Sequence, residues 1–434
     1  MTDILRRVIA RNRAGEVAAI PSVCSAHPEV LRACLMRAEV LDRPIVIEAT
    51  SNQVNPDGGY TGLTPAGFVG FVGQIAAAAG VRRARIIFGG DHLGPQVWRK
   101  GPADAAMAKA REMVTAYVQA GFAKIHLDCS EGCAGEPAQL GHALAAARAA
   151  DLAQACHAAA ADPGALLYVI GTEVPPPGGA RKDEAVEIVP TTAASACATL
   201  ATHAEALSRL GLVAEMGQIG GLVVQPGVEF SPMAVHHLPL ARDPGLRAAL
   251  ADWPETCLEA HSTDYQRPAA YPRLAELGFA FQKVGPALTF AYRQAVYGLD
   301  TLCQMAGWAS GARLCDTMEQ LMLADPGAWR GHYHGKDMRL QRHFGLADRI
   351  RYYWPQREAK ATVARLLADL QGRALPEALL RQVFASAVLE RADGLAMARP
   401  QALIAATIQL ALDPYFFDAA PIADATTKTG GGRG

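Results

Sequence analysis

One stretch shows the unit from which this chain is built: Ile86-Ile87-Phe88-Gly89-Gly90-Asp91-His92-Leu93-Gly94-Pro95. The apolar run at its start predicts a buried β-strand. The two glycines predict a turn that brings the backbone close to a ligand, and Gly-Pro ends that turn. An acid–base group and a metal-ligand residue type at a strand end are typical of an active site. A loop with a capping Asp and a surface His explains the same residues, and the stretch alone does not separate the two.

The same unit recurs along the chain. Short apolar runs alternate with helical segments, and the predicted strands cover residues 17–24, 44–49, 85–89, 124–128, 166–170, 221–225, 256–260 and 279–284. This alternation predicts right-handed βαβ units and a parallel sheet. Eight such units fit a closed (β/α)₈ TIM barrel. A doubly wound open sheet is the alternative, but it would normally carry G-x-G-x-x-G after its first strand, and no strand-to-helix turn here does.

The pattern divides the chain into three parts. Residues 1–300 are predicted to form the barrel, including a lead-in helix over residues 1–14. Residues 301–425 are predicted to form a C-terminal helical region packed on the barrel. The glycine-rich tail at residues 426–434 predicts disorder.

The composition excludes several classes of protein. Half of the 434 residues are hydrophobic, which is typical of a globular protein. The 41 basic residues balance 42 acidic ones, so the net charge does not indicate a protein that binds nucleic acid or an anionic membrane. No apolar run is long enough to span a membrane, and the N-terminus lacks the pattern of a signal peptide. Nine cysteines without framework spacing indicate a reducing compartment. The sequence therefore predicts a cytoplasmic globular protein.

Polar residues follow the predicted strands, and in a TIM barrel the strand ends form the rim that carries the chemistry. These residues are Glu48 with Ser51, Asn52 and Gln53, then Asp91 and His92, Asp128, Glu173, Gln225 with Glu229, His261 with Asp264, and Lys283. So many ionisable groups on one rim would be costly without a ligand or a metal to balance them. The rim therefore predicts an enzyme.

Three rim residues form a candidate metal set: His92, Glu173 and His261, with Gln225 as a fourth candidate. Imidazole and carboxylate ligands suit a divalent ion, with Zn²⁺ first and Mn²⁺, Ni²⁺ or Co²⁺ as alternatives. Asp91 is the candidate acid or base. Asp128 and Glu48 either orient the ligands or supply a second acid or base. The alternative is that the histidines are hydrogen-bonded rim residues and the aspartates cap loops.

The turn after the eighth predicted strand indicates a phosphate site. Residues 285–289 open a helix, and the N–H groups at such a helix start commonly bind phosphate in this fold. Lys283 and Arg351 would add positive charge, although a buried structural ion pair also explains Lys283. We therefore expect a phosphorylated small substrate. Its candidate contacts are Ser51, Asn52, Gln53, Glu229, Asp264, Lys283, Gly285, Thr289 and Arg351.

Eight segments together resemble one family over nearly the whole chain. They are EATSNQ at 48–53, GGDHLGP at 89–95, KIHLDCS at 124–130, GTEVP at 171–175, VVQPGVEF at 223–230, EAHSTDYQ at 259–266, KVGPALTF at 283–290 and RYYWP at 351–355. They resemble the tagatose-bisphosphate aldolase GatZ/KbaZ-type subunit family, a relative of the zinc-dependent class II aldolase barrels. The resemblance implies that Asp91 is the acid or base and that His92 and His261 are metal ligands. Where a class II aldolase offers a third histidine after the sixth strand, this chain has Gln225.

The resemblance implies three functions in carbohydrate metabolism, of which galactitol catabolism is one setting. Some members are 4-epimerases of ketohexoses, and others are labelled non-catalytic partners of a separate aldolase subunit; intrinsic aldolase activity is the third. C4 of a 2-ketose is not adjacent to the carbonyl, so its inversion needs retro-aldol cleavage of C3–C4 or transient oxidation, and the second requires a dinucleotide site. We therefore expect a metal-dependent 4-epimerase of D-tagatose 6-phosphate and D-fructose 6-phosphate. A homo-oligomer or association with an aldolase subunit is also expected.

Overall fold

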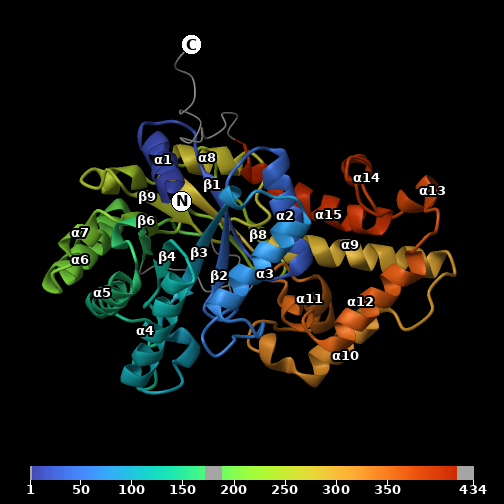
Figure 1. The fold of residues 1–434 in the computed structure, drawn as a ribbon, viewed down its shortest axis with the longest axis horizontal. Coiled ribbons are helices and arrows are strands. Elements are labelled where there is room, and N and C mark those ends of the chain that lie inside the picture. Colours follow the sequence, from blue (N-terminus) through green and yellow to red (C-terminus); the bar gives the residue numbers. More distant parts are fainter. Residues whose placement is uncertain (1, 172–187, 418–434) are drawn as a thin grey trace, which may run out of the picture.

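The predicted barrel is confirmed in the computed structural model, which describes residues 2–171 and 188–417 (Figure 1). Eight parallel strands close in the order β1-β10-β9-β6-β5-β4-β3-β2. They are β1 Ile20–Cys24, β2 Ile45–Thr50, β3 Ile86–Leu93, β4 Lys124–Leu127, β5 Leu167–Ile170, β6 Ile219–Val223, β9 Cys257–Ala260 and β10 Phe279–Val284. Closure leaves no sheet edge exposed and excludes the open doubly wound sheet. Glu173 and the tail at 426–434 lie outside the described residues.

Helices surround the strands and close one end of the barrel. The helices up to the last barrel strand and directly after it are α1 Thr2–Arg13, α2 Pro28–Val40, α3 Pro65–Ala78, α4 Ala103–Gln119, α5 His142–Ala159, α6 Ala193–Arg209, α7 Val213–Met216, α8 Ala270–Glu276 and α9 Pro286–Met305. The apolar face of α1, formed by Leu5, Val8 and Ile9, packs into a buried cluster with inward-facing strand residues such as Ile87 and Phe281. Because α1 fills the amino end of the barrel, the carboxyl end remains for a ligand.

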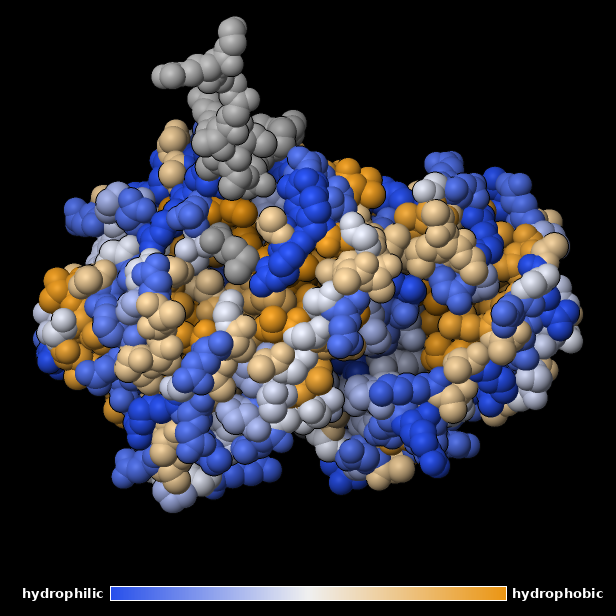
Figure 2. Space-filling model, in the orientation of Figure 1, coloured by the Kyte–Doolittle hydropathy of each residue, from blue (hydrophilic) through white to orange (hydrophobic). Residues whose placement is uncertain are grey.

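The C-terminal helices extend to one side of the barrel (Figure 1). They are α10 Leu314–Ala324, α11 Met338–Phe344, α12 Arg357–Leu370, α13 Glu377–Leu380, α14 Ser386–Asp393 and α15 Arg399–Leu412. Helix α15 packs against both α2 and α9, and α12 packs against α9 and α10. Figure 2 shows hydrophobic residues on the surface between α9 and α12. Among the described residues, no helix has the length and apolarity needed to cross a membrane.

A small hairpin after β6 was not predicted. Strands β7 Glu229–Phe230 and β8 Val235–His236 pair antiparallel outside the barrel. With two residues each, they are too short to show an alternating pattern in the sequence.

The predicted turn at Gly89 and Gly90 was wrong. Strand β3 continues to Leu93, with a register shift after Gly90. The two glycines instead permit close packing, because a Cβ on Gly89 would lie 2.8 Å from Glu48 Cγ and one on Gly90 would lie 2.5 Å from Leu93 Cδ1. The change of direction falls at His92, whose φ of 48° is left-handed. Strain of this kind in a residue other than glycine is common at functional sites.

The packing around Gly94 generates a stability prediction. A Cβ at this position would lie 1.7 Å from the backbone oxygen of Asp128, and a backbone atom cannot move aside as a side chain can. We expect Gly94→Ala to lower the free energy of unfolding by about 3 kcal/mol. In urea denaturation, Gly73→Ala is the matched control, because it lies in α3 with nothing within 4 Å of the added Cβ and should raise stability by up to about 1 kcal/mol. Equal stability of the two variants would contradict the close contact.

Candidate active site

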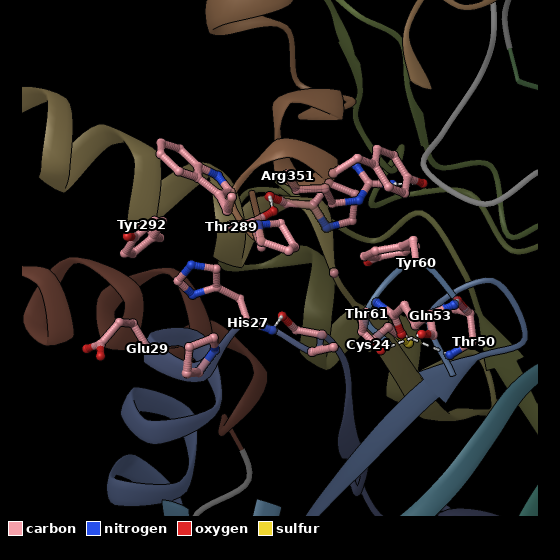
Figure 3. Close-up of a pocket in the computed structure, with 18 of the residues that line it drawn as sticks. Cys24, His27, Glu29, Thr50, Gln53, Tyr60, Thr61, Thr289, Tyr292 and Arg351 are labelled. Carbon is pink, nitrogen blue, oxygen red and sulfur yellow. Dashed lines mark hydrogen bonds between the residues drawn. The ribbon is translucent and has the colours of Figure 1, made fainter. Parts of the chain in front are cut away.

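A cavity of about 640 Å³ opens at the carboxyl ends of the strands and extends toward the C-terminal helices. Its walls include Cys24 from β1, the loop after β2, Asp91 and His92 from β3, and Lys283 from β10. The predicted site residues that line it are Asn52, Gln53, Asp91, His92, His261, Asp264, Lys283, Gly285, Thr289 and Arg351. Figure 3 shows Cys24, Gln53, Thr61 and Tyr60 on one side of this space and His27, Glu29 and Tyr292 on the other.

A buried network of opposite charges lies beneath this cavity. Lys124 Nζ lies 2.5 Å from Glu48 Oε1 and 2.5 Å from Glu259 Oε2, and all three side chains are fully buried. Lys283 Nζ contacts the carboxylate of Asp91 and lies 3.4 Å from Glu48 Oε2 and 3.3 Å from Glu259 Oε1. Two ammonium groups are therefore shared among three carboxylates. Removing one member would leave a buried charge unpaired, which is strongly unfavourable.

The network keeps Glu48 and Lys124 ionised. Burial by itself would raise the pKa of Glu48, but the nearby charges of Lys124 and Lys283 outweigh it and lower that pKa. Burial would lower the pKa of Lys124, but Glu259 and Glu48 raise it. The interior of the barrel therefore holds fixed charges at neutral pH.

Three histidines form a triangle beside this network: His92 from β3, His126 from β4 and His261 after β9. Their ring centroids lie 5.1, 5.2 and 5.3 Å apart. Each ring has a nitrogen within 3.0 Å of a carboxylate oxygen, and the second nitrogen of His92 lies 3.6 Å from Asp91 Oδ1. The pairs are His92 Nδ1 with Asp128 Oδ2 at 2.8 Å, His261 Nε2 with Glu259 Oε1 at 2.8 Å and His126 Nδ1 with Asp91 Oδ1 at 3.0 Å. A carboxylate in this position fixes ring orientation and leaves the other nitrogen for a metal.

The histidine triangle fits a divalent metal. His126 Nε2 is buried and has no hydrogen-bond partner within residues 2–171 and 188–417. Burial lowers the pKa values of His126 and His261 to about 4, so both are neutral at pH 7, the form that coordinates metals. With bonds of about 2.1 Å, two imidazoles on a tetrahedral ion have ring centres roughly 5 Å apart. Ligand atoms of His126 and His261 lie within 4.8 Å of one another and of Asp91, whereas His92 does not belong to this group.

Sequence reasoning missed His126, Lys124 and Glu259 because it considered only residues at or beyond the strand ends. The signal was present in the strand period. Residues two apart in a strand point to the same side, so Lys124 shares a side with His126, and Glu259 shares one with His261. Cys24 was missed as well; its Sγ lies 3.1 Å from Glu48 Oε2 and 3.4 Å from Asp91 Oδ2.

The other predicted ligands and acids are placed as follows. Asp128 is buried and holds His92, and its second oxygen accepts from Ser130 Oγ at 2.6 Å, which agrees with an orienting role. Gln225 Oε1 accepts from the N–H groups of Gly227 at 2.8 Å and Val228 at 3.0 Å, so its oxygen is committed to the loop and is not a free ligand.

The predicted contacts Glu229 and Ser51 do not line the cavity. Glu229 lies in β7, where its Oε1 accepts from the N–H of Phe230 at 2.8 Å. Ser51 is fully buried, and its hydroxyl has no hydrogen-bond partner among the residues that the structure describes. Only Asn52 and Gln53 of the three polar residues after β2 reach the cavity.

The start of α9, where the sequence predicts a phosphate site at Gly285, carries a carboxylate in the structure. Asp264 Oδ1 accepts from the N–H groups of Gly285 at 3.0 Å and Ala287 at 2.8 Å. These N–H groups are therefore not free for phosphate. Burial raises the pKa of Asp264 to about 6, although both N–H groups act in the opposite direction.

Arg351 forms part of the cavity wall in the 3-10 helix Arg349–Tyr353. Its guanidinium donates to the carbonyl oxygens of Ala347 and Asp348, and it lies 4.6 Å from the centre of the Tyr352 ring. Its own loop therefore fixes this cation in the wall.

The model of the D-tagatose-1,6-bisphosphate aldolase subunit GatZ/KbaZ-like family matches residues 5–420. The chain is 48% identical over 422 residues to the D-tagatose 6-phosphate 4-epimerase of Agrobacterium fabrum, covering 96% of this chain and 98% of that protein. It is 42% identical over 426 residues to the D-tagatose-1,6-bisphosphate aldolase subunit GatZ of Salmonella dublin, covering 96% and 99%.

One solved structure is similar across almost the whole fold. It is a crystal structure from Sinorhizobium meliloti 1021, titled a probable tagatose 6 phosphate kinase, with a TM-score of 0.83 and 44% sequence identity. The match covers 92% of this chain and 99% of that one.

The raised pKa of Asp264 generates a pH prediction. Between pH 4 and 6 the unfolded chain ionises this group while the folded protein keeps it protonated, so the group reduces stability as pH rises through this window. Asp264→Asn keeps an acceptor for α9 but does not titrate. We expect the free energy of unfolding of Asp264→Asn minus that of the native protein to increase from pH 4 to 7, by at most about 3 kcal/mol. Asp162→Asn is the control, because Asp162 makes the same kind of cap to Gly164 at the surface. A difference independent of pH would contradict the prediction.

Proposed function

This chain belongs to the D-tagatose-1,6-bisphosphate aldolase subunit GatZ/KbaZ-like family, and from that premise we propose that it is a metal-dependent 4-epimerase of ketohexose phosphates. It would interconvert D-tagatose 6-phosphate and D-fructose 6-phosphate. The observation that carries the proposal is the position of Asp91. Its carboxylate lines the cavity, contacts the Lys283 ammonium and lies 3.0 Å from His126 Nδ1, so an acid–base group stands beside a metal-binding set.

The proposed reaction breaks and re-forms the C3–C4 bond. Asp91 takes the proton of the C4 hydroxyl, C4 becomes an aldehyde, and the electron pair of the C3–C4 bond moves onto the C2 carbonyl as an enediolate. The aldehyde rotates, C3 attacks its other face, and Asp91 returns the proton to the new C4 hydroxyl. No atoms are gained or lost, and no oxidant is required.

Lys283 would stabilise the negative charge that develops on the substrate oxygens. Its ammonium is held among Asp91, Glu48 and Glu259, so it acts as a fixed cation. The same ion pairs argue against Schiff-base chemistry, because that requires a neutral amine. The walls of the cavity would limit the escape of the aldehyde before it rotates.

His92, His126 and His261 would hold the metal, for which we propose Zn²⁺ first, with Mn²⁺, Ni²⁺ or Co²⁺ as alternatives. The ion would supply Lewis-acid stabilisation of charge on the substrate. Glu173, the predicted carboxylate ligand, remains a prediction. Of the predicted contacts, Asn52, Gln53, Thr289 and Arg351 line the wall along which the sugar would lie. The cytoplasm remains the proposed location.

The second candidate function is a stabilising subunit of a tagatose-bisphosphate aldolase. Relatives such as the one from Salmonella dublin carry that name at 42% identity. However, a purely structural subunit has no physical need for a buried network of five charges beside three metal-binding side chains. Binding to an aldolase subunit and catalysis are compatible, because the first uses the surface and the second the cavity.

Activity of the protein alone separates these functions. We expect the purified protein to convert D-tagatose 6-phosphate into D-fructose 6-phosphate, and a chelator to abolish this. Asp91→Asn should lower kcat by about 10²- to 10⁴-fold, because it removes the proton acceptor. Asp104→Asn, in the exposed first turn of α4, is the control and should match the native protein. If the protein activates a separate aldolase but converts no substrate by itself, the epimerase is refuted. Triose products would show intrinsic aldolase activity.

The metal set is tested by metal content. We expect His92→Ala, His126→Ala and His261→Ala each to lower the metal bound after gel filtration well below one ion per chain, measured by atomic emission. His203→Ala is the matched control, because His203 is buried in α6 against the carbonyl of Thr199. Full metal content in His126→Ala would remove that residue from the set.

A further inference from the structure

The far side of the cavity, opposite Cys24 and Gln53, has the features of an anion site. It begins at the N-terminus of α2, which follows β1 (Figure 3). His27 is the N-cap residue, Pro28 is the first helical residue, and no side chain caps the helix. His27, Pro28, Glu29 and Arg32 all line the cavity. The free N–H groups of a helix start attract anions.

A buried donor without an acceptor points to a ligand at the same place. Trp354 lines the cavity and is 4% exposed, and its indole Nε1 has no hydrogen-bond partner among the described residues. An aromatic stack holds this ring in place, with Tyr292 5.2 Å from Trp354 and 4.0 Å from His27 between ring centroids. A buried indole N–H without a partner is costly unless a ligand accepts from it.

The charges on this side favour an anion. Lys360 lines the cavity from α12, and among the described residues it forms no ion pair. Arg32 pairs with Glu29, and its Nε is buried without a hydrogen-bond partner in the part of the chain that the structure describes. Glu29 is the one carboxylate among the described residues on this side, and Arg32 balances it, so Lys360 remains as net positive charge. Within the same described residues, His27 Nδ1 also has no hydrogen-bond partner.

We propose that this side of the cavity is a phosphoryl-binding subsite, built from the start of α2, Trp354, Lys360 and Arg32. A phosphate group has the negative charge and the acceptor oxygens that these donors lack. Two other positions in the cavity that could attract an anion are already paired with carboxylates. Asp264 accepts from the start of α9, and three carboxylates surround Lys283. The assignment to the substrate's own phosphate rests on the proposed function; a separate phosphorylated molecule offers the same chemistry.

Binding measurements on the metal-loaded protein test the subsite without turnover. Inorganic phosphate, D-fructose 6-phosphate and free D-fructose are titrated calorimetrically against the native protein, Lys360→Gln and Trp354→Phe. The phenylalanine keeps the aromatic stack and removes the N–H. We expect both variants to bind inorganic phosphate about tenfold more weakly. Lys336→Gln, at an exposed lysine outside the cavity lining, is the control and should bind as the native protein does.

The two sources of phosphate give different results. If the substrate's phosphate binds here, the variants also lose about tenfold in affinity for D-fructose 6-phosphate but not for free D-fructose, and inorganic phosphate competes with the sugar phosphate. If a separate molecule binds here, the variants lose affinity for inorganic phosphate but not for D-fructose 6-phosphate. Inorganic phosphate then does not compete with the sugar phosphate. Native affinity of both variants for inorganic phosphate, or no phosphate binding by the native protein, overturns the subsite. Because binding is measured, this failure is distinct from a failure of the epimerase assay.

Discussion

The structure depends on the pairing of charges inside the barrel. Lys124 is enclosed by Glu48 and Glu259, and Lys283 joins these carboxylates to Asp91. Each charge would be strongly unfavourable alone in a buried interior, and each is tolerated because its partners point into the same barrel interior from other strands. The strand register is thereby tied to the chemistry, since a slip of one residue would turn these side chains away from one another. Gly89 is part of the same constraint, because a side chain there would displace Glu48.

The carboxylates of this network also orient the candidate metal ligands. Glu259 contacts both Lys124 and His261, and Asp91 contacts both Lys283 and His126. A change in one charge is therefore transmitted to an imidazole through a single hydrogen bond. This arrangement holds the rings before any metal or substrate arrives, so little reorganisation is needed when charge develops on a substrate.

The C-terminal helices complete the cavity that the barrel begins. Helix α15 packs on α2 and α9, and α12 supplies Lys360 to the far wall. The cavity is therefore lined by elements that are far apart in sequence. The start of α2 faces this wall without a cap, whereas the start of α9 is closed by Asp264. Two helix starts that look equivalent in the sequence thus differ in what they can bind, because a distant loop reaches only one of them.

The sequence by itself determined the eight-stranded barrel and the placement of Asp91, His92, His261 and Lys283 on one rim, because strand periodicity and the strand-end rule are local patterns. Only the tertiary structure decided which side chains meet. In the tertiary structure, His126 lies in the histidine triangle and Gln225 accepts hydrogen bonds from its own loop. Asp264 accepts hydrogen bonds from the start of α9. These outcomes depend on distances between residues on different strands and loops, and no pattern along the chain encodes those distances directly.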